Sequence, residues 1–219
     1  MAASLTLAVL VSGRGSNLKA LLEAIDRGAC AATVGCVISD RPGAPALSLA
    51  SARGIATHVV PAKAYADRAA WDEALASQLA AAAPELIVLA GFMRIVGRAV
   101  LAHFAGRIIN VHPALLPAFP GMDAPAQAIA ARVCLSGCTV HVVDDGVDTG
   151  PVLAQAAVPV RRDDDADSLH ARIQTAEHAL LPAVVHAIAT GALVLEREAP
   201  RYTGSYPEEL PRLVSPPLL

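Results

Sequence analysis

The chain has 219 residues and a formal net charge of −3 at pH 7, and it is 54% hydrophobic but only 3% aromatic. A chain of this length buries a substantial, here aliphatic, core, and its charge leaves no basic footprint for nucleic acid. With no 18-residue apolar window and no basic N-terminal region, we expect a cytoplasmic protein without a membrane or nucleic-acid partner. The cysteines lack zinc-site spacing, and we expect small, buried, unbridged residues and no bound metal: Cys30, Cys36, Cys134 and Cys138.

Strand and helix patterns alternate through the first half of the chain. Apolar runs predict strands at residues 5–11, 33–39, 57–60 and 85–90, and helical spacing predicts helices at residues 18–25, 44–53, 67–83 and 98–104. The run E-L-I-V-L-A at residues 85–90 is nearly continuous, as in a parallel strand covered on both faces. This alternation predicts an α/β fold with a Rossmann-like parallel sheet flanked by helices.

The first predicted strand runs into the glycine turn S-G-R-G-S-N at residues 12–17, which is followed by a helix. A turn of this kind presents backbone N–H groups and a positive helix end to an anion. Gly13 and Gly15 let the backbone approach closely, and Ser16 and Asn17 either cap the helix or bind a phosphate. The turn predicts a phosphate site or, on its own, an ordinary capped helix start.

An acid follows the second predicted strand, as in many dinucleotide-binding folds. Asp40 stands where such folds bind a ribose hydroxyl, which would favour a nicotinamide enzyme. The pattern G-x-G-x-x-G is incomplete, however, because its third glycine position is Leu18, and residues 41–43 also suit an ordinary turn. Farther along, the loop at residues 91–96 follows the carboxyl end of a buried strand, a usual place for ligands.

The stretch R-I-I-N-V-H-P at residues 107–113 predicts a buried strand that Pro113 ends. Asn110 and His112 lie two apart, so both side chains point to the same side. An amide and an imidazole at the end of a strand suit an oxygen that gains negative charge, although each alone is commonly structural. The proline-rich loop at residues 113–125 is long and stiff, which is typical of functional loops.

The C-terminal part predicts a helix at residues 126–132, strands at 137–143 and 151–160 around an acidic tip, and a long helix at 168–190. Such a hairpin predicts that the sheet becomes antiparallel at this end. The tip carries Asp148, and a carboxylate beside His112 would favour its protonated form and orient the ring. No serine, cysteine or lysine stands in a nucleophile setting, which favours attack by the substrate's own amine. Residues 193–196 predict an edge strand, and the proline-rich segment 198–219 shows no clear element.

Five motifs occur together and in order: residues 12–17, A-G-F-M-R-I at 90–95, I-N-V-H-P-A-L-L-P at 109–117, T-V-H-V-V-D-D-G-V-D-T-G-P at 139–151, and R-I-Q-T-A-E-H at 172–178. With them the chain, over about residues 5–197, resembles the glycinamide ribonucleotide formyltransferase family. The resemblance implies the formyltransferase fold in one domain, residues 1–197, followed by a tail at 198–219. Its phosphate-binding half would span about residues 1–104 and its catalytic half about 105–197.

The resemblance also implies roles for individual residues. Asn110, His112 and Asp148 would form the catalytic group. Gly15, Ser16 and Asn17 would hold the ribonucleotide phosphate and Glu177 the glycinamide. The co-substrate 10-formyltetrahydrofolate would contact Arg68, Met93, Arg94, Ile95, Val96, Asn110, Asp144 and Val147. The amine would attack the formyl carbon and tetrahydrofolate would leave, in a monomer or homodimer.

One segment departs from the family pattern. Asp123 and Pro125 stand where many bacterial members carry histidines, in a loop over the folate site. Two alternatives remain open: a formyltetrahydrofolate hydrolase-like enzyme, which shares the formyl-folate core, and a non-catalytic nucleotide-binding module.

Overall fold

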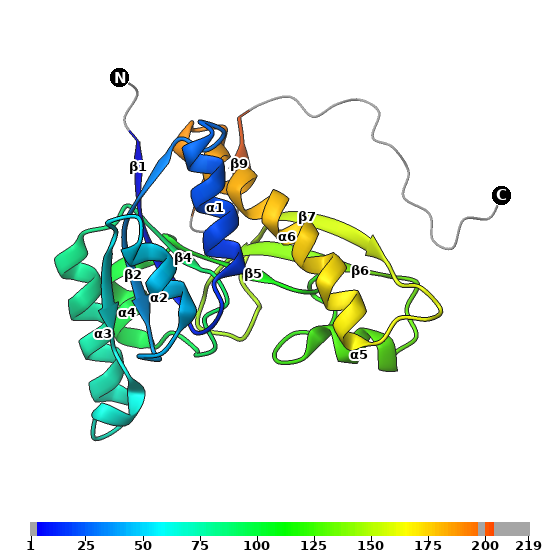
Figure 1. Cartoon of the computed structure of the whole chain (residues 1–219), viewed down its shortest axis with the longest axis horizontal. Helices are drawn as coiled ribbons and strands as arrows, with labels where there is room; N and C mark the ends of the chain where they lie inside the picture. Colours follow the sequence, from blue (N-terminus) through cyan, green and yellow to red (C-terminus); the bar gives the residue numbers. More distant parts are fainter. Residues whose placement is uncertain (1–3, 197–199, 204–219) are drawn as a thin grey trace.

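The computed structural model describes residues 4–196 and 200–203 and is built on one seven-stranded sheet (Figure 1). The strand order across the sheet is β3-β2-β1-β4-β5-β6-β7. The strands are β1 (Leu5–Val11), β2 (Ala32–Ser39), β3 (Ala56–Val59), β4 (Leu86–Leu89), β5 (Ile108–His112), β6 (Leu135–Val142) and β7 (Val152–Pro159). The main helices are α1 (Ser16–Asp26), α2 (Pro45–Ser51), α3 (Arg68–Ala82), α4 (Arg98–Phe104), α5 (Ala124–Ala130) and α6 (Ala166–Ala189), and a 3-10 turn η1 covers Ala62–Ala64.

The five strands β1 to β5 run parallel, and hydrophobic side chains cover both faces of this part of the sheet. Along β1, Leu7 and Val9 belong to a core shared with α1, α2 and α6, whereas Ala8 and Leu10 belong to a second core shared with α3 and α4. Burial on both faces explains why β1 and β4 read as continuous apolar runs rather than as alternating ones. The predicted Rossmann-like sheet flanked by helices is confirmed.

The sheet changes direction at β6, which pairs antiparallel with both β5 and β7. The long helix α6 lies over β6 and β7 and beside α1 (Figure 1). It begins with a capping box in which Asp165 accepts from the Ser168 backbone N–H, while the Ser168 hydroxyl accepts from the Asp165 N–H. The predicted antiparallel extension at this end is therefore confirmed.

Three details of the C-terminal prediction are wrong. Helix α5 begins at Ala124 rather than 126 and ends at Ala130, since Pro125 lies in its first turn, where a missing N–H costs no helical bond. Leu193–Val194 (β8) is not an edge of the main sheet but pairs with Arg201–Tyr202 (β9) in a small antiparallel ribbon. In the segment 198–219, residues 200–203 are described and include β9, so the prediction of no clear element is wrong there, and its remainder lies outside the described residues.

The cysteine prediction is wrong at one position. All four thiols are free, and Cys30, Cys36 and Cys138 are buried, but Cys134 is exposed. Burial raises the pKa of the Cys30 thiol to about 11 and that of Cys138 to about 12, so these thiols are packing groups. Within the described residues, no helix is long and apolar enough to cross a membrane, and no cluster of three or more His, Cys, Asp or Glu side chains suits a metal ion.

Candidate active site

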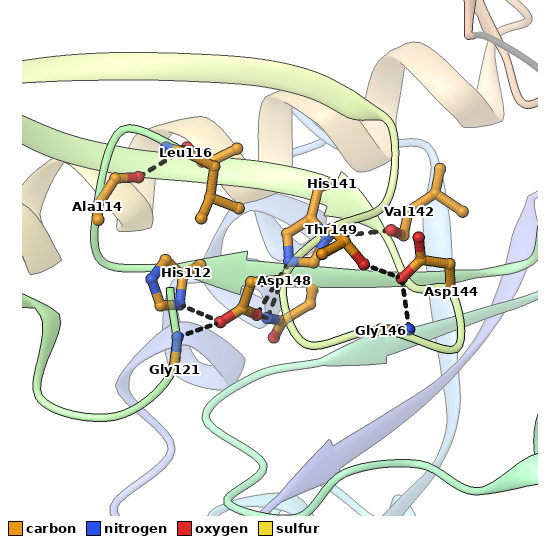
Figure 2. A network of polar contacts seen from close by, with 12 residues as sticks. His112, Ala114, Leu116, Gly121, His141, Val142, Asp144, Gly146, Asp148 and Thr149 are labelled. Carbon is orange, nitrogen blue, oxygen red and sulfur yellow. Dashed lines mark hydrogen bonds and ion pairs between the residues drawn. The ribbon is translucent and has the colours of Figure 1, made fainter. Parts of the chain in front are cut away.

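Polar groups from three separate segments, both side-chain and backbone, meet beyond the end of β5 (Figure 2). The strand supplies Asn110 and His112, the following proline-rich loop supplies Gly121, and the tip between β6 and β7 supplies Asp148. Proline cannot extend a sheet ladder, so Pro113 ends β5 and leaves His112 at the boundary between strand and loop. Segments far apart in the sequence thus place their polar groups at one point.

The carboxylate of Asp148 is the centre of this cluster (Figure 2). Its Oδ2 lies 3.2 Å from His112 Nδ1 and accepts the Gly121 N–H at 2.8 Å. Its Oδ1 lies 3.4 Å from Asn110 Nδ2 and 3.5 Å from His141 Nε2. The residue adopts a left-handed backbone conformation, with φ of 55°, which Asp tolerates better than most residues because its short side chain can hydrogen-bond locally. Both oxygens therefore face donors.

The His112 ring is buried, and each of its nitrogens faces an acceptor. Nδ1 faces Asp148 Oδ2, and Nε2 lies 2.8 Å from the carbonyl oxygen of Phe119. A neutral imidazole carries only one N–H, so it can donate to only one of these two oxygens. Each ring nitrogen is therefore within hydrogen-bond reach of an oxygen, and Nδ1 is the one that faces the carboxylate.

A second buried histidine, His141, completes the cluster and was missed by the sequence interpretation. It stands opposite Asn110 in the β5–β6 ladder, and its Nε2 lies 3.2 Å from Asn110 Nδ2. Its Nδ1 lies 3.0 Å from the carbonyl oxygen of Val142, which suits a donated N–H (Figure 2). The strand pattern could have shown a histidine on an otherwise apolar strand, but only the register places it beside Asn110.

The surroundings keep Asp148 ionised. Burial by itself raises the pKa of this carboxyl group, but the hydrogen bond from His141, the Gly121 N–H and the nearby histidine charges outweigh burial. The net result is a pKa below the ordinary value for aspartate, so the group is a carboxylate at neutral pH.

The loop that carries Asp148 is held by its own side chains. Asp144 Oδ1 accepts the Gly146 N–H at 3.1 Å and the Thr149 hydroxyl at 2.8 Å (Figure 2). Gly150 approaches the β6 backbone so closely that a Cβ atom there would collide with the Val142 carbonyl group. The predicted folate residue Asp144 thus shapes the tip, and Val147 is exposed at it.

The glycine turn after β1 does not use Ser16 or Asn17 as a helix cap, which was one of its two predicted roles. Helix α1 starts at Ser16 behind Gly15, which has φ of 78° and no side chain that caps the helix. A Cβ on Gly15 would lie 2.6 Å from that of Ala46, so glycine is needed for both conformation and space. The first N–H groups of α1 are therefore not capped by the side chain of Ser16 or Asn17.

Asn17 instead connects the turn to α6. Its Nδ2 donates to Glu177 Oε2 at 2.9 Å, while its buried Oδ1 has no partner among the described residues. Burial raises the pKa of Glu177, and the Asn17 hydrogen bond offsets this only partly. Beside this pair, a cavity of about 530 Å³ lies between α1 and α6, with Ser16, Lys19 and His178 in its wall.

The loop at residues 91–97 presents Met93 and Ile95 to solvent, each about half exposed. Arg68, at the start of α3, donates to the Ile95 carbonyl group at 2.7 Å. The side chain of Arg94 is partly exposed, and its Nε donates to Asp40 Oδ2 at 2.9 Å. Asp40 also accepts the Ser12 hydroxyl, so its carboxylate is occupied and does not stand ready for a ribose.

Comparison with known proteins identifies the group to which these features belong. The model of the formyl transferase family matches residues 5–185. The chain belongs to the formyl transferase family. Phosphoribosylglycinamide formyltransferase of Escherichia coli is 42% identical to it over 195 residues, covering 89% of this chain and 92% of that protein. The corresponding Mycobacterium tuberculosis protein is 47% identical, covering 88% and 89%. Members of the family also occur within longer proteins, and this chain spans 14% of a Drosophila melanogaster trifunctional purine biosynthetic protein that is 45% identical.

Solved formyl transferase structures agree with the fold. A glycinamide ribonucleotide transformylase from Symbiobacterium toebii superposes with a TM-score of 0.88 at 43% identity, covering 91% of this chain and 94% of that one. A formyltetrahydrofolate deformylase from Pseudomonas syringae superposes with a TM-score of 0.84 at 23% identity, which shows a shared fold alone. Membership of the family implies a folate-derived formyl donor.

Proposed function

We propose that the protein transfers the formyl group of 10-formyltetrahydrofolate to the amine of 5'-phosphoribosylglycinamide. Relatives at 42% and 47% identity, similar over nearly their whole length, bear the name of this enzyme. The observation that carries the proposal is the Asp148 carboxylate, which has His112 Nδ1 at 3.2 Å and Asn110 Nδ2 at 3.4 Å. Such a group can stabilise negative charge on a carbonyl oxygen that lies beside it.

In the proposed reaction, the amine nitrogen of the ribonucleotide bonds to the formyl carbon and the formyl oxygen becomes negative. Asn110 Nδ2 and a ring N–H of His112 donate to that oxygen, and the ionised Asp148 orients the His112 ring through Nδ1. When the intermediate collapses, the bond between the formyl carbon and N10 of the folate breaks. The amine loses one proton and N10 gains one, so formyl-glycinamide ribonucleotide and tetrahydrofolate are formed.

His141 acts in this scheme as a positioning residue. Its Nδ1 lies beside the Val142 carbonyl group, and its Nε2 lies 3.2 Å from Asn110 Nδ2 and 3.5 Å from Asp148 Oδ1. These contacts hold the amide of Asn110 in place beside the reacting oxygen. The role of His141 is thus exerted through Asn110 and not on the substrate.

We propose that the ribonucleotide binds between α1 and α6. The backbone N–H groups of Ser16 and Asn17, which follow Gly15, have no side-chain cap. They suit a phosphate, because they lie at the positive N-terminal end of α1. Glu177 and the unpartnered Asn17 Oδ1 are acceptors that suit the N–H groups of the glycinamide. The desolvated carboxylate of Glu177 gains most from a cationic or N–H partner.

The formyl-folate is proposed to bind against three loops that expose apolar side chains. Met93 and Ile95 come from one loop, Val147 from the hairpin tip, and Met122 from the proline-rich loop. The main chain of residues 93–96 would contact the pteridine, with Arg68 and Asp144 at the edges. Asp123 lies in the left-handed region with φ of 57° immediately before α5, so the segment that departs from the family pattern is the start of a helix here.

The decisive test is an assay of tetrahydrofolate release from 10-formyltetrahydrofolate, with and without 5'-phosphoribosylglycinamide. Release only when the ribonucleotide is present is expected, together with formylated product in equal amount. Release without ribonucleotide would instead indicate a hydrolase, and binding of ribonucleotide without any release would indicate a non-catalytic module. The cytoplasmic location, the division at about residue 104 and the monomeric or homodimeric state remain predictions.

A further inference from the structure

The loop at residues 91–97 is held from behind by a buried carboxylate on α3. Asp72 is only 5% exposed, and its two oxygens accept the backbone N–H groups of Gly97 at 2.8 Å and Ala99 at 2.7 Å. The neighbouring Trp71 ring stacks on Phe92, with ring centroids 6.4 Å apart. The end of the loop and the start of α4 are therefore fixed to one side chain.

A second buried carboxylate holds the middle of the same loop. Asp40 is 6% exposed and accepts the Ser12 hydroxyl at 2.6 Å and Arg94 Nε at 2.9 Å. Because its hydrogen is directed at Asp40, the Ser12 oxygen is free to accept the Met93 N–H, at 2.8 Å. The guanidinium group of Arg94 also lies 5.7 Å from the centre of the Trp71 ring.

These contacts leave the other side of the loop available. Phe92 and Val96 are buried, whereas Met93 and Ile95 are about half exposed. In the described part of the chain, no hydrogen bond uses the main-chain N–H or C=O group of Arg94. At Arg94 the loop therefore offers an unpaired donor and acceptor between two exposed apolar side chains, while Asp72 holds its end and Asp40, through Ser12 and Arg94, holds its middle.

We propose that Asp72 and Asp40 are positioning residues that hold this loop in the shape that binds the formyl-folate, without touching the substrate. The assignment rests on the proposed function, since it takes the loop to be the folate-binding surface. It assigns a role to Asp40 that differs from ribose binding, and one to Asp72 that no sequence motif indicates.

Charge is what suits Asp72 to this role. Two N–H groups converge on one carboxylate, and each of its oxygens accepts one of them. An asparagine would instead point its own NH₂ group at one of these two N–H groups. Space is equally restricted, because a Cβ on Gly97 would lie 2.6 Å from Asp72 Oδ1. Gly97 has φ of −96°, which any residue can adopt, so its backbone conformation does not require glycine. Glycine is needed there because the Asp72 carboxylate leaves no room for a Cβ atom.

The first experiment measures Asp72→Asn by amide hydrogen exchange and by calorimetry with each substrate alone. The N–H groups of Gly97 and Ala99 are expected to exchange faster, and the Kd for 10-formyltetrahydrofolate to rise about tenfold, since a hydrogen bond to a charged group is lost. The Kd for 5'-phosphoribosylglycinamide and the kcat at saturating folate should change less than about twofold. Glu85→Gln, which alters an acid that accepts the Thr6 N–H at another edge, is the matched control.

A second experiment tests space rather than charge. Gly97→Ala should weaken folate binding in the same way, and Asp72→Ala in the same chain should relieve the collision, so that the double variant binds folate no worse than Asp72→Ala alone. Gly43→Ala is the control, because no atom lies within 4 Å of the added Cβ.

Equal losses for both substrates, or unchanged folate binding with faster exchange at Gly97, would overturn the assignment. A wild-type protein that binds no 10-formyltetrahydrofolate would instead overturn the proposed function itself. The exchange data, which need no substrate, would still report whether Asp72 holds the loop.

Discussion

Two acids near the carboxyl ends of strands, Asp40 and Asp148, lie in surroundings that differ in kind. Asp40 is paired with the hydroxyl of Ser12 and the guanidinium group of Arg94. Asp148 is paired with the imidazole rings of His112 and His141 and with an amide and a backbone N–H. Both are acids in loops after a strand, and nothing in their local sequence alone tells them apart.

The difference lies in whether the partners can change their charge. Arginine stays protonated and a serine hydroxyl stays neutral at ordinary pH, so Asp40 is part of a permanent structure. Imidazoles gain and lose protons near neutral pH, so Asp148 belongs to a group that can move charge during a reaction. Asp40 therefore holds the structure of a loop, whereas Asp148 takes part in the proposed reaction.

The sharpest test of this comparison is to make the same substitution at both acids. Asp148→Asn should lower kcat by on the order of 10³, because the ion pair with His112 is lost. Asp40→Asn should mainly raise the folate KM, by about tenfold. Steady-state kinetics with both substrates distinguishes these outcomes, and equal effects of the two variants on kcat would break the comparison.

Acid unfolding gives a control on Asp148→Asn. The pKa of Asp148 is lowered in the folded protein, so its contribution to stability is present above the unfolded value of 3.8 and is lost as pH falls through the folded value. The asparagine variant should lack that part of the acid dependence. Asparagine tolerates the left-handed backbone at this position, so a folded variant is expected.

The next largest effect is expected at His112. His112→Ala removes a donor to the developing oxyanion, and kcat should fall by about 10²–10³. The ribonucleotide KM should change little, because His112 does not belong to that part of the site. His103→Ala is the matched control, since His103 is exposed on α4. Near-normal formyl transfer by the His112 variant would remove this residue from the mechanism.

His141 should show a smaller effect that reveals positioning. His141→Ala removes a side chain that holds the Asn110 amide in place, and kcat should fall by about tenfold, in line with the loss of one hydrogen bond. The pH profile of kcat should also change, because the His141 hydrogen bond that lowers the pKa of Asp148 is lost. A lower melting temperature with an unaltered pH profile would mean that His141 only packs the strand.

The fold was predictable where burial imposes a pattern, and the site where one strand or a family motif carries it. The apolar runs of β1 and β4 and the spacing of Asn110 and His112 contain their own information. His141 and Asp72 were not found, because the first depends on the β5–β6 register and the second on which loop a helix covers. Contacts between distant segments are a property of the tertiary packing, which local spacing does not encode.

The smallest expected effect concerns Glu177, a third acid whose surroundings differ again. Burial raises the pKa of its carboxyl group above the unfolded value of 4.5. Between these two pH values, the folded protein holds a proton that the unfolded chain has released. Stability must therefore decrease as pH rises from 4.5 to the folded value. Glu177→Gln removes this cost and keeps an acceptor for Asn17, so denaturant unfolding at neutral pH should show a stability equal to or slightly above that of the wild type. The affinity for the ribonucleotide should fall, because the glycinamide loses its carboxylate partner. If the variant is instead less stable at neutral pH and binds the ribonucleotide normally, Glu177 serves the fold.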